Sequence, residues 1–600
     1  MNDIDTLFKR PHIPSKRKFE PSPNPSDIYK STKTFENGGS QSGQRTAVVE
    51  EDEEAQDGED GVAGPNLPLD EEELAGSPDE EGRFFGGGVN RNTAEVLDFI
   101  DEQEKQEYTE ERIDSAWLRR LALNFEKRIS KNAELRAKFE NTPQKFMSSE
   151  ADLDADVKAL SILSDHPELF DEFSQLGCVA SLVSLIAHDN TDIALDAIEI
   201  INELTDEDVE AEQIQWNALV DALLEADLAN LIVQNFSRLD ESNESDRAGV
   251  YHSLAIFENL ASQPAISEKL VQNSEALKWL LTRIQKLESP VTQNKQYASE
   301  VLAILLQASN SNRLSVISLD GADLLLQLLS AYRKRDPLKD SDEEEFVENL
   351  FNCLTCLVED TKGKHAFVEA EGVELCLIML REGKWSKPRS LRLLDHALGG
   401  STAVEVCERF VDSAGLKPLF GMYMKHMDHQ STEHILGLIA SLLRRLPGES
   451  APRIRTLAKF MEKDYEKIQK LVQVRREYVS RLRPIEAQIA EERSRATSDD
   501  VELLEDEWLS RRLDNGLFCL QTADMILAWL VAEDEGARRT ITKLLGQDGQ
   551  DLSILRKTLQ EQLDDMASSP AEDETGEKET LTTLLDLCRE MCPRPEYFVA

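Results

Sequence analysis

The chain has 600 residues and a large acidic excess, with 115 Asp and Glu against 67 Lys and Arg and a formal net charge of −48. Such a charge repels phosphate backbones, so we expect no direct nucleic-acid binding and look to basic protein segments as partners. No uncharged apolar run reaches the roughly eighteen residues of a membrane helix, and Leu517–Ala532, the richest candidate, contains Asp524. Eight scattered cysteines favour a reducing compartment. We therefore expect an intracellular, soluble protein without membrane contact.

Residues 1–91 are predicted to be a disordered tail, because they are rich in Pro, Gly, Ser and Asn and poor in clustered apolar side chains. Near its start lies a basic cluster made of Lys9, Arg10, Lys16, Arg17 and Lys18. We interpret this cluster as a nuclear localisation signal read by an import receptor, and a solvated charge cluster is the open alternative. The acidic run 46–82 holds fifteen Asp and Glu and no Lys or Arg. It is either a solvating segment or a competitor for basic partners.

Residues 92–170 are predicted to form an N-terminal helical cap. Helical patterns cover Thr93–Gln106 and Ser115–Phe139. In the second of these, apolar residues recur along one helical face, which predicts that this face is buried. They are Trp117, Leu118, Leu121, Phe125 and Ile129.

The segment Gly177–Asp206 reads as a short helix opened by a glycine, a polar turn and a longer helix, each with an apolar stripe at helical spacing. Equivalent segments begin at Ala226, Glu275, Gly321, Gly372 and Gly415, at successive offsets of 49, 49, 46, 51 and 43 residues. Neither helix can bury its apolar face alone, so neighbouring units must stack. We therefore predict an all-α, armadillo/HEAT-like helical-repeat solenoid over residues 171–450.

Residues 451–600 are predicted to be a C-terminal helical region. A charged helix over Arg453–Arg495, interrupted at Pro484, is followed by more apolar helices over Asp500–Glu533, Asp551–Met566 and Leu581–Met591. This region would cover the open apolar end of the solenoid. The sequence leaves open whether it also forms a second binding surface or pairs two copies as a homodimer.

Polar residues on the longer repeat helices are the candidate partner-binding site. Asp196, Glu199 and Glu203 share the spacing of one exposed helical face. Candidates on later repeats continue this row: Glu258, Asn259, Glu300, Glu348 and Asn352. Carboxylates in such a row could pair with Lys and Arg of a partner, and an ordinary solvated face is the alternative.

No motif indicates catalysis, a cofactor or a metal. Cys353 and Cys356 lie in an apolar helical run without a second ligand pair, so we expect core cysteines. His426, His429 and His434 flank a turn, but the sequence indicates no carboxylate or thiol to complete a metal site there. No phosphate-binding loop and no nucleophile elbow is present. The sequence therefore predicts a protein that is not an enzyme.

Several of these segments together resemble the beta-catenin-like protein one family of armadillo-type nuclear proteins. The motifs are Asn124–Arg128 (NFEKR), Asn132–Phe139 (NAELRAKF), Lys145–Met147 (KFM), His188–Asp192 (HDNTD), Leu231–Asn235 (LIVQN), Ser299–Gln307 (SEVLAILLQ) and Arg511–Phe518 (RRLDNGLF). The resemblance extends from about Ile113 to about Trp529. In the tail it is limited to the order of a basic cluster and an acidic run.

The resemblance implies a nuclear, spliceosome-associated scaffold within the assembly built around the pre-mRNA-processing nineteen protein and its Myb-like component. It also implies recognition of basic, localisation-signal-like segments of splicing factors. A nuclear import adaptor that recognises basic cargo signals is the alternative. Armadillo proteins of the peptide-gripping type use an asparagine ladder on their third helices, and here only Asn259 occupies that position plainly, with Asn202 one place out of step. Charge pairing is therefore expected to supply more of the binding.

Overall fold

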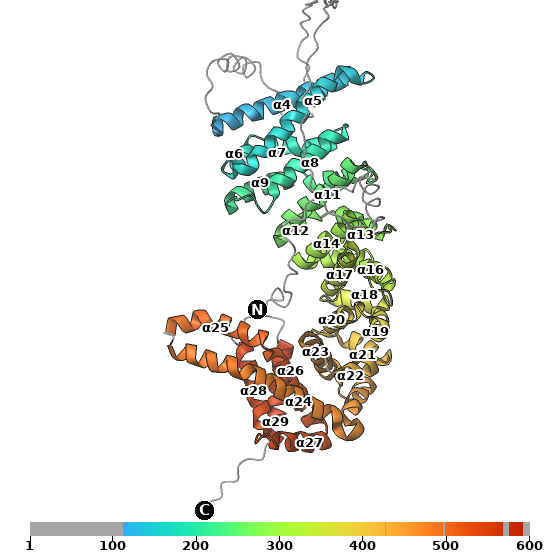
Figure 1. Cartoon of the computed structure of the whole chain (residues 1–600), viewed down its shortest axis with the longest axis vertical. Helices are drawn as coiled ribbons and strands as arrows, with labels where there is room; N and C mark the ends of the chain where they lie inside the picture. The colour runs from blue at the N-terminus through green and yellow to red at the C-terminus, as the bar shows by residue number, and fades with distance from the viewer. Residues whose placement is uncertain (1–111, 426–427, 496–497, 568–574, 592–600) are drawn as a thin grey trace, which may run out of the picture.

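The computed structural model describes residues 112–425, 428–495, 498–567 and 575–591 (Figure 1). All regular elements in these ranges are helices, which confirms the all-α prediction. The tail 1–91, with its basic cluster and its acidic run, and the predicted helix Thr93–Gln106 lie outside the described residues.

Six three-helix units follow one another in the described part of the chain. Their first helices are α6 (Phe170–Gln175), α9 (Gln213–Glu225), α12 (Pro264–Leu270), α15 (Asn310–Ser318), α18 (Thr361–Glu369) and α21 (Val404–Asp412). The second are α7 (Cys178–Ser184) with η5 (Leu185–Ala187), α10 (Leu228–Phe236), α13 (Glu275–Gln285), α16 (Gly321–Ser330), α19 (Gly372–Glu382) and α22 (Leu416–Tyr423). The third are α8 (Thr191–Thr205), α11 (Glu244–Leu260), α14 (Gln293–Ala308), α17 (Asp342–Leu357), α20 (Ser386–Leu398) and α23 (His429–Arg445).

Further helices precede and follow the repeats. Before them come α4 (Ser115–Lys138), η2 (Pro143–Lys145), α5 (Met147–Ala159), η3 (Leu160–Asp165) and η4 (Pro167–Leu169). After them come α24 (Ala451–Arg495), α25 (Ser498–Asp514), α26 (Leu517–Glu533), α27 (Glu535–Gly546), α28 (Ser553–Ala567) and α29 (Thr575–Met591). The whole array is elongated, with α4 and α5 at one end and α24–α29 at the other (Figure 1).

One residue with a left-handed backbone reverses the chain between the first and second helix of every unit. These residues are Gly177, Asp227, Ser274, Asp320, Glu371 and Ala414, with φ between 56° and 79°. Gly177 adopts this conformation without strain because it has no Cβ, whereas the other side chains carry a steric cost. Conformation, not glycine identity, is therefore what repeats at this turn.

The third helices pack one on the next and form a continuous layer, from α5 through α8, α11, α14, α17, α20 and α23 to α26. We call it the third-helix layer. One hydrophobic core runs beneath it, with buried side chains from Leu118 to Leu555. Such a core forms because each unit hides its apolar stripe only against its neighbours.

Buried cations join successive units at the ends of third helices. Lys364 of α18 donates from Nζ to the carbonyl oxygens of Val358, 2.6 Å away, and His396, 3.1 Å away. Arg453 of α24 donates from Nη1 to the carbonyl oxygen of Leu446 at 3.0 Å. The last carbonyls of a helix lack intrahelical partners and carry partial negative charge, which these cations neutralise. Each of these two cations therefore completes the end of the third helix that precedes it in the chain.

The C-terminal helices pack on the end of the third-helix layer, and α24 with α25 projects to one side as a hairpin (orange in Figure 1). The predicted interruption at Pro484 is wrong, because the non-helical residues of α24 are Glu462–Tyr465. Pro484 is exposed, and a helix can tolerate a missing N–H on its solvent side.

In the described residues no single helix is long and apolar enough to cross a membrane, although two bent helix pairs are long and apolar enough by length and composition alone.

A buried ion pair fixes these C-terminal helices to one another. Arg475 of α24 donates from Nε to Oδ1 of Asp524 in α26 at 2.6 Å, and Asp524 is fully buried. The hydroxyl of Thr558 in α28 donates to the second carboxylate oxygen at 2.8 Å. Three helices thus converge on one carboxylate.

Candidate partner-binding site on the third-helix layer

All eight predicted partner-binding residues lie on third helices. Asp196, Glu199 and Glu203 are on α8, Glu258 and Asn259 on α11, Glu300 on α14, and Glu348 and Asn352 on α17. Since these helices are successive members of the third-helix layer, the fold places the predicted residues on neighbouring helices. Their local surroundings differ, however.

On α8, Glu199 is exposed and Glu203 is half-buried. Burial, followed by the charge of Glu199, raises the pKa of Glu203. No ion pair to either carboxylate is found among the described residues. Asp196 differs, because it lies beside α5 with Lys158 Nζ 3.4 Å from its carboxylate. Burial and the neighbouring Asp154 raise the pKa of Asp196 to about 7.

Next to these acids, amide side chains of α8 and α11 contact one another. Asn259 Nδ2 donates to Asn202 Oδ1 and to Thr205 Oγ1, each at 3.4 Å. His252 Nδ1 lies 3.4 Å from the amide nitrogen of Asn202. Asn202, one place out of step in the sequence, is therefore adjacent to Asn259 in space. His252 was missed because its sequence neighbours give no polar pattern.

Glu258 and Glu300 are occupied within the protein. The hydroxyl of Tyr297 donates to Glu258. Glu300 is only 7% exposed and accepts from Gln296 Nε2 at 2.8 Å. Both carboxylates bond inside the layer, and Glu300 in addition offers little surface to a partner.

Glu348 and Asn352 on α17 are bonded to arginines of the next repeat. Glu348 accepts from Arg389 Nε at 2.5 Å and from Arg392 Nη2 at 3.0 Å. Arg392 also donates to Asn352 Oδ1 at 2.9 Å. The guanidinium of Arg389 lies 3.6 Å from the ring centre of Trp385. The two arginines are three apart in α20, a spacing that puts them on one helical face.

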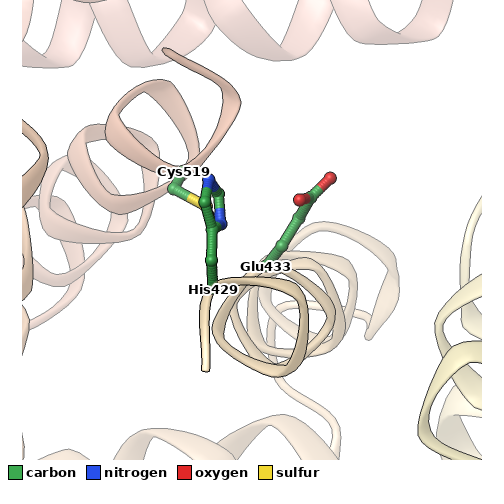
Figure 2. Close-up of side chains that lie close together, drawn as sticks. All are labelled: His429, Glu433 and Cys519. Atoms are coloured by element: carbon green, nitrogen blue, oxygen red, sulfur yellow. The ribbon is translucent and has the colours of Figure 1, made fainter. Parts of the chain in front are cut away.

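The histidines near residue 430 are arranged differently from the predicted grouping. His434 Nδ1 lies 3.0 Å from Asp395 Oδ2, and His426 lies outside the described residues. His429, by contrast, lies beside Glu433 and Cys519 (Figure 2). The expectation that no carboxylate or thiol lies near these histidines is therefore wrong, because α26 brings in a thiol from ninety residues away.

The paired cysteines of α17 are core residues, as expected. Cys353 is fully buried and Cys356 is 8% exposed, and both are free thiols. Burial raises the pKa of Cys356 to about 11, and among the described residues no third potential ligand gathers with this pair.

Comparison with known families gives one clear match. A family model described as catenin-beta-like, Arm-motif containing nuclear matches residues 94–560. Beta-catenin-like protein 1 homolog of Schizosaccharomyces pombe is 40% identical over 470 residues, covering 78% of this chain and 82% of that protein. Beta-catenin-like protein 1 of Homo sapiens is 36% identical over 492 residues, covering 79% and 86%.

Among the solved structures similar to this chain is one from work on a phosphorylation switch that controls the interaction between cadherin and beta-catenin. It has a TM-score of 0.38 and 12% identity, covering 80% of this chain and 97% of that chain. A designed armadillo repeat protein in complex with the peptide (KR)4 has a TM-score of 0.34 and 12% identity, covering 44% and 99%. Because these scores are low, the fold assignment rests on the helix packing above and on the family match.

Proposed function

This chain belongs to the catenin-beta-like family of Arm-motif-containing nuclear proteins, and on that basis we propose that it is a nuclear, spliceosome-associated scaffold. The stacked helical repeats make it a scaffold in form, and armadillo repeats typically bind proteins without catalysis. In this proposal the partners are basic, localisation-signal-like segments of splicing factors, including the Myb-like component of the nineteen-type assembly. The basic cluster of the tail engages an import receptor.

The observation that carries the proposal is the juxtaposition of unpaired acids and amides on α8 and α11. Glu199 and Glu203 have no ion-pair partner in the described part of the chain, and they lie on the helix that also presents Asn202 to Asn259. Carboxylates would pair with Lys or Arg side chains, and amides would bond the extended peptide backbone. Each exposed ion pair contributes about 0.2–1 kcal/mol and is screened by salt. We call Glu199, Glu203, Asn202 and Asn259 the α8–α11 patch.

Affinity capture from nuclear extract with the full chain, at low and at high salt, tests the proposal. We expect splicing factors to be captured at low salt and lost at high salt. The variant Glu199→Lys/Glu203→Lys should lose them. The matched control Asp221→Lys/Glu225→Lys changes two exposed acids of α9 with the same spacing and should capture them normally.

Three other results would change the proposal. Capture of import receptors with broad cargo, without splicing factors, would favour the import-adaptor alternative. Equal loss in both variants would show that net charge matters and the α8–α11 patch does not. Absence of any splicing factor at low salt would contradict the proposal as a whole.

A further inference from the structure

Where the repeats meet the C-terminal helices, three potential metal ligands of different kinds lie together. His429 and Glu433 are four residues apart on α23, and Cys519 belongs to α26. One nitrogen of the imidazole, one carboxylate oxygen and the sulfur all lie within 4.8 Å of one another. Figure 2 shows His429 and Glu433 projecting from the same side of α23, with Cys519 facing the His429 ring from α26.

The separations are close to those of a metal site. Cys519 Sγ is 4.0 Å from His429 Nδ1. In a tetrahedral zinc site, with Zn–S near 2.3 Å and Zn–N near 2.0 Å, the sulfur and nitrogen stand about 3.5 Å apart. A shift of about half an ångström would bring this sulfur and nitrogen to that separation, and a carboxylate oxygen of Glu433 lies within 4.8 Å of both. Residues four apart on a helix lie on one face, so the carboxylate of Glu433 reaches the same point without unwinding α23.

The surroundings hold these ligands in place. Cys519 is fully buried, while His429 and Glu433 are half-buried. The hydroxyl of Tyr478 from α24 lies 3.4 Å from His429 Nδ1, the nitrogen that also faces Cys519 Sγ, and this contact gives way when Nδ1 binds a metal. Gly516 begins α26 with φ +94°, and a Cβ there would come within 2.4 Å of the Tyr478 ring. Only glycine permits this approach, which brings Cys519 to the imidazole.

We propose that His429, Glu433 and Cys519 form a zinc site that fastens α26 to the last repeat helix. The ligand types select the metal: thiolate and imidazole suit Zn²⁺, whereas Mg²⁺ and Ca²⁺ require oxygen ligands. A thiolate and a carboxylate together carry two negative charges, which balance a divalent ion in this partly buried place. Three protein ligands leave a fourth position to solvent. The site does not depend on the proposed splicing role.

Binding must displace protons, so it depends on pH. Burial raises the pKa of the Cys519 thiol to about 12, and zinc binding replaces that thiol proton. Burial also raises the pKa of Glu433. The other charged or titratable groups facing these ligands are Tyr478 and Arg481 of α24, Asp395 of α20 and His434 of α23. Since zinc binds the thiolate and not the thiol, affinity for zinc should fall as the pH is lowered.

Zinc titration of the chelator-treated full-length chain tests the site, with a chromophoric chelator as competitor. We expect one equivalent of Zn²⁺ to bind and the thermal midpoint to rise by several degrees. His429→Ala and Cys519→Ser should each weaken binding at least about tenfold. Co²⁺ in place of zinc should give a thiolate-to-cobalt charge-transfer band, which Cys519→Ser removes.

Three controls separate this site from others. His365→Ala alters an exposed histidine beside Glu405 and should leave binding unchanged. Cys178→Ser alters a buried thiol elsewhere and should keep the cobalt band, as should the double variant Cys588→Ser/Cys592→Ser. Absence of zinc binding by the wild-type chain would overturn the proposal. So would unchanged binding in His429→Ala and Glu433→Gln, both of which alter half-buried side chains and spare the core.

Discussion

Glutamates on α8 and on α17, in the two halves of the third-helix layer, have different surroundings. On α8, Glu199 and Glu203 have no ion-pair partner in the described residues, and the amides of Asn202 and Asn259 lie beside them. On α17, Glu348 is paired within the protein, since it accepts from two arginines of α20. Among the described residues, glutamates thus have no ion pair on α8, in the first half, and join neighbouring repeats on α17, in the second. Net charge alone therefore does not locate a binding surface.

The largest effect is expected where internal pairing is complete. Asp524→Ala leaves Arg475 buried without a counter-charge, and removing one partner of a buried pair costs about 3–5 kcal/mol. We expect the free energy of unfolding to fall by that amount in urea denaturation. Glu535→Ala, which removes exposed pairs of α27, should change it by less than about 0.5 kcal/mol. Similar values for both variants would contradict the view that the buried ion pair contributes more to stability than the exposed ion pairs do.

Neutral variants sharpen the contrast between the two halves in binding. Glu199→Gln/Glu203→Gln should weaken binding of a fluorescent Lys- and Arg-rich peptide about tenfold, measured by anisotropy at low salt, because two exposed pairs are lost. Glu348→Gln should leave peptide affinity unchanged and lower the free energy of unfolding by about 1 kcal/mol, since a half-buried network loses its acceptor. The reverse pattern would place the peptide on α17 and α20.

The pH dependence of stability tests whether Asp196, the third predicted partner-binding acid of α8, is half-buried within the protein and unavailable to a partner. Burial raises the pKa of Asp196 from 3.8 to about 7, so the folded chain holds this proton more tightly than the unfolded chain does. The stabilisation is present at low pH and lost as the pH rises through about 7. Asp196→Asn does not titrate, so at pH 8 it should be more stable than wild type by roughly 1 kcal/mol. The difference in stability between Asp196→Asn and wild type, measured by thermal denaturation, should narrow toward pH 4. A difference that stays constant with pH would contradict this account.

The smallest effect concerns the turns that both halves share. Ala414 has a φ of 61°, which costs an alanine free energy that glycine avoids. Ala414→Gly should raise the free energy of unfolding by about 0.5 kcal/mol. The reciprocal control is Gly177→Ala, where a Cβ would contact nothing within 4 Å and only the backbone strain remains. It should lower stability by a similar amount. A loss of stability in Ala414→Gly, or a gain in Gly177→Ala, would mean that side-chain packing and not backbone strain determines the stability of these turns.

The repeat architecture was predictable because its signal is periodic. The predicted helix Ser115–Phe139 agrees closely with α4, since apolar residues at helical spacing are retained over several turns. The first helices were not predicted. Except for α9, with 13 residues, they span at most two or three turns, as Thr361–Glu369 does, which is too short for a periodic pattern to stand out.

For the candidate partner-binding site, the sequence predicted which helices its residues lie on but not what those residues contact. Spacing puts Glu199 and Glu203 on one face, but it cannot reveal that Arg389 and Arg392 neutralise Glu348, because that pairing joins residues about forty positions apart. The grouping of His429 with Cys519 spans ninety positions and depends on how α24 and α25 return α26 to the repeats. Long-range pairings of this kind follow from packing, and a single sequence contains no local trace of them.

The buried cations at the helix ends affect how this chain can be divided. Lys364 belongs to one repeat by sequence, yet its ammonium bonds the carbonyl that ends α17 in the preceding unit. A fragment ending at residue 360 would expose that carbonyl and truncate the cooperative unit, as would a fragment ending before Arg453. Stable fragments should therefore extend through the first helix of the next repeat. For the same reason, local fraying at one repeat should spread to its neighbours.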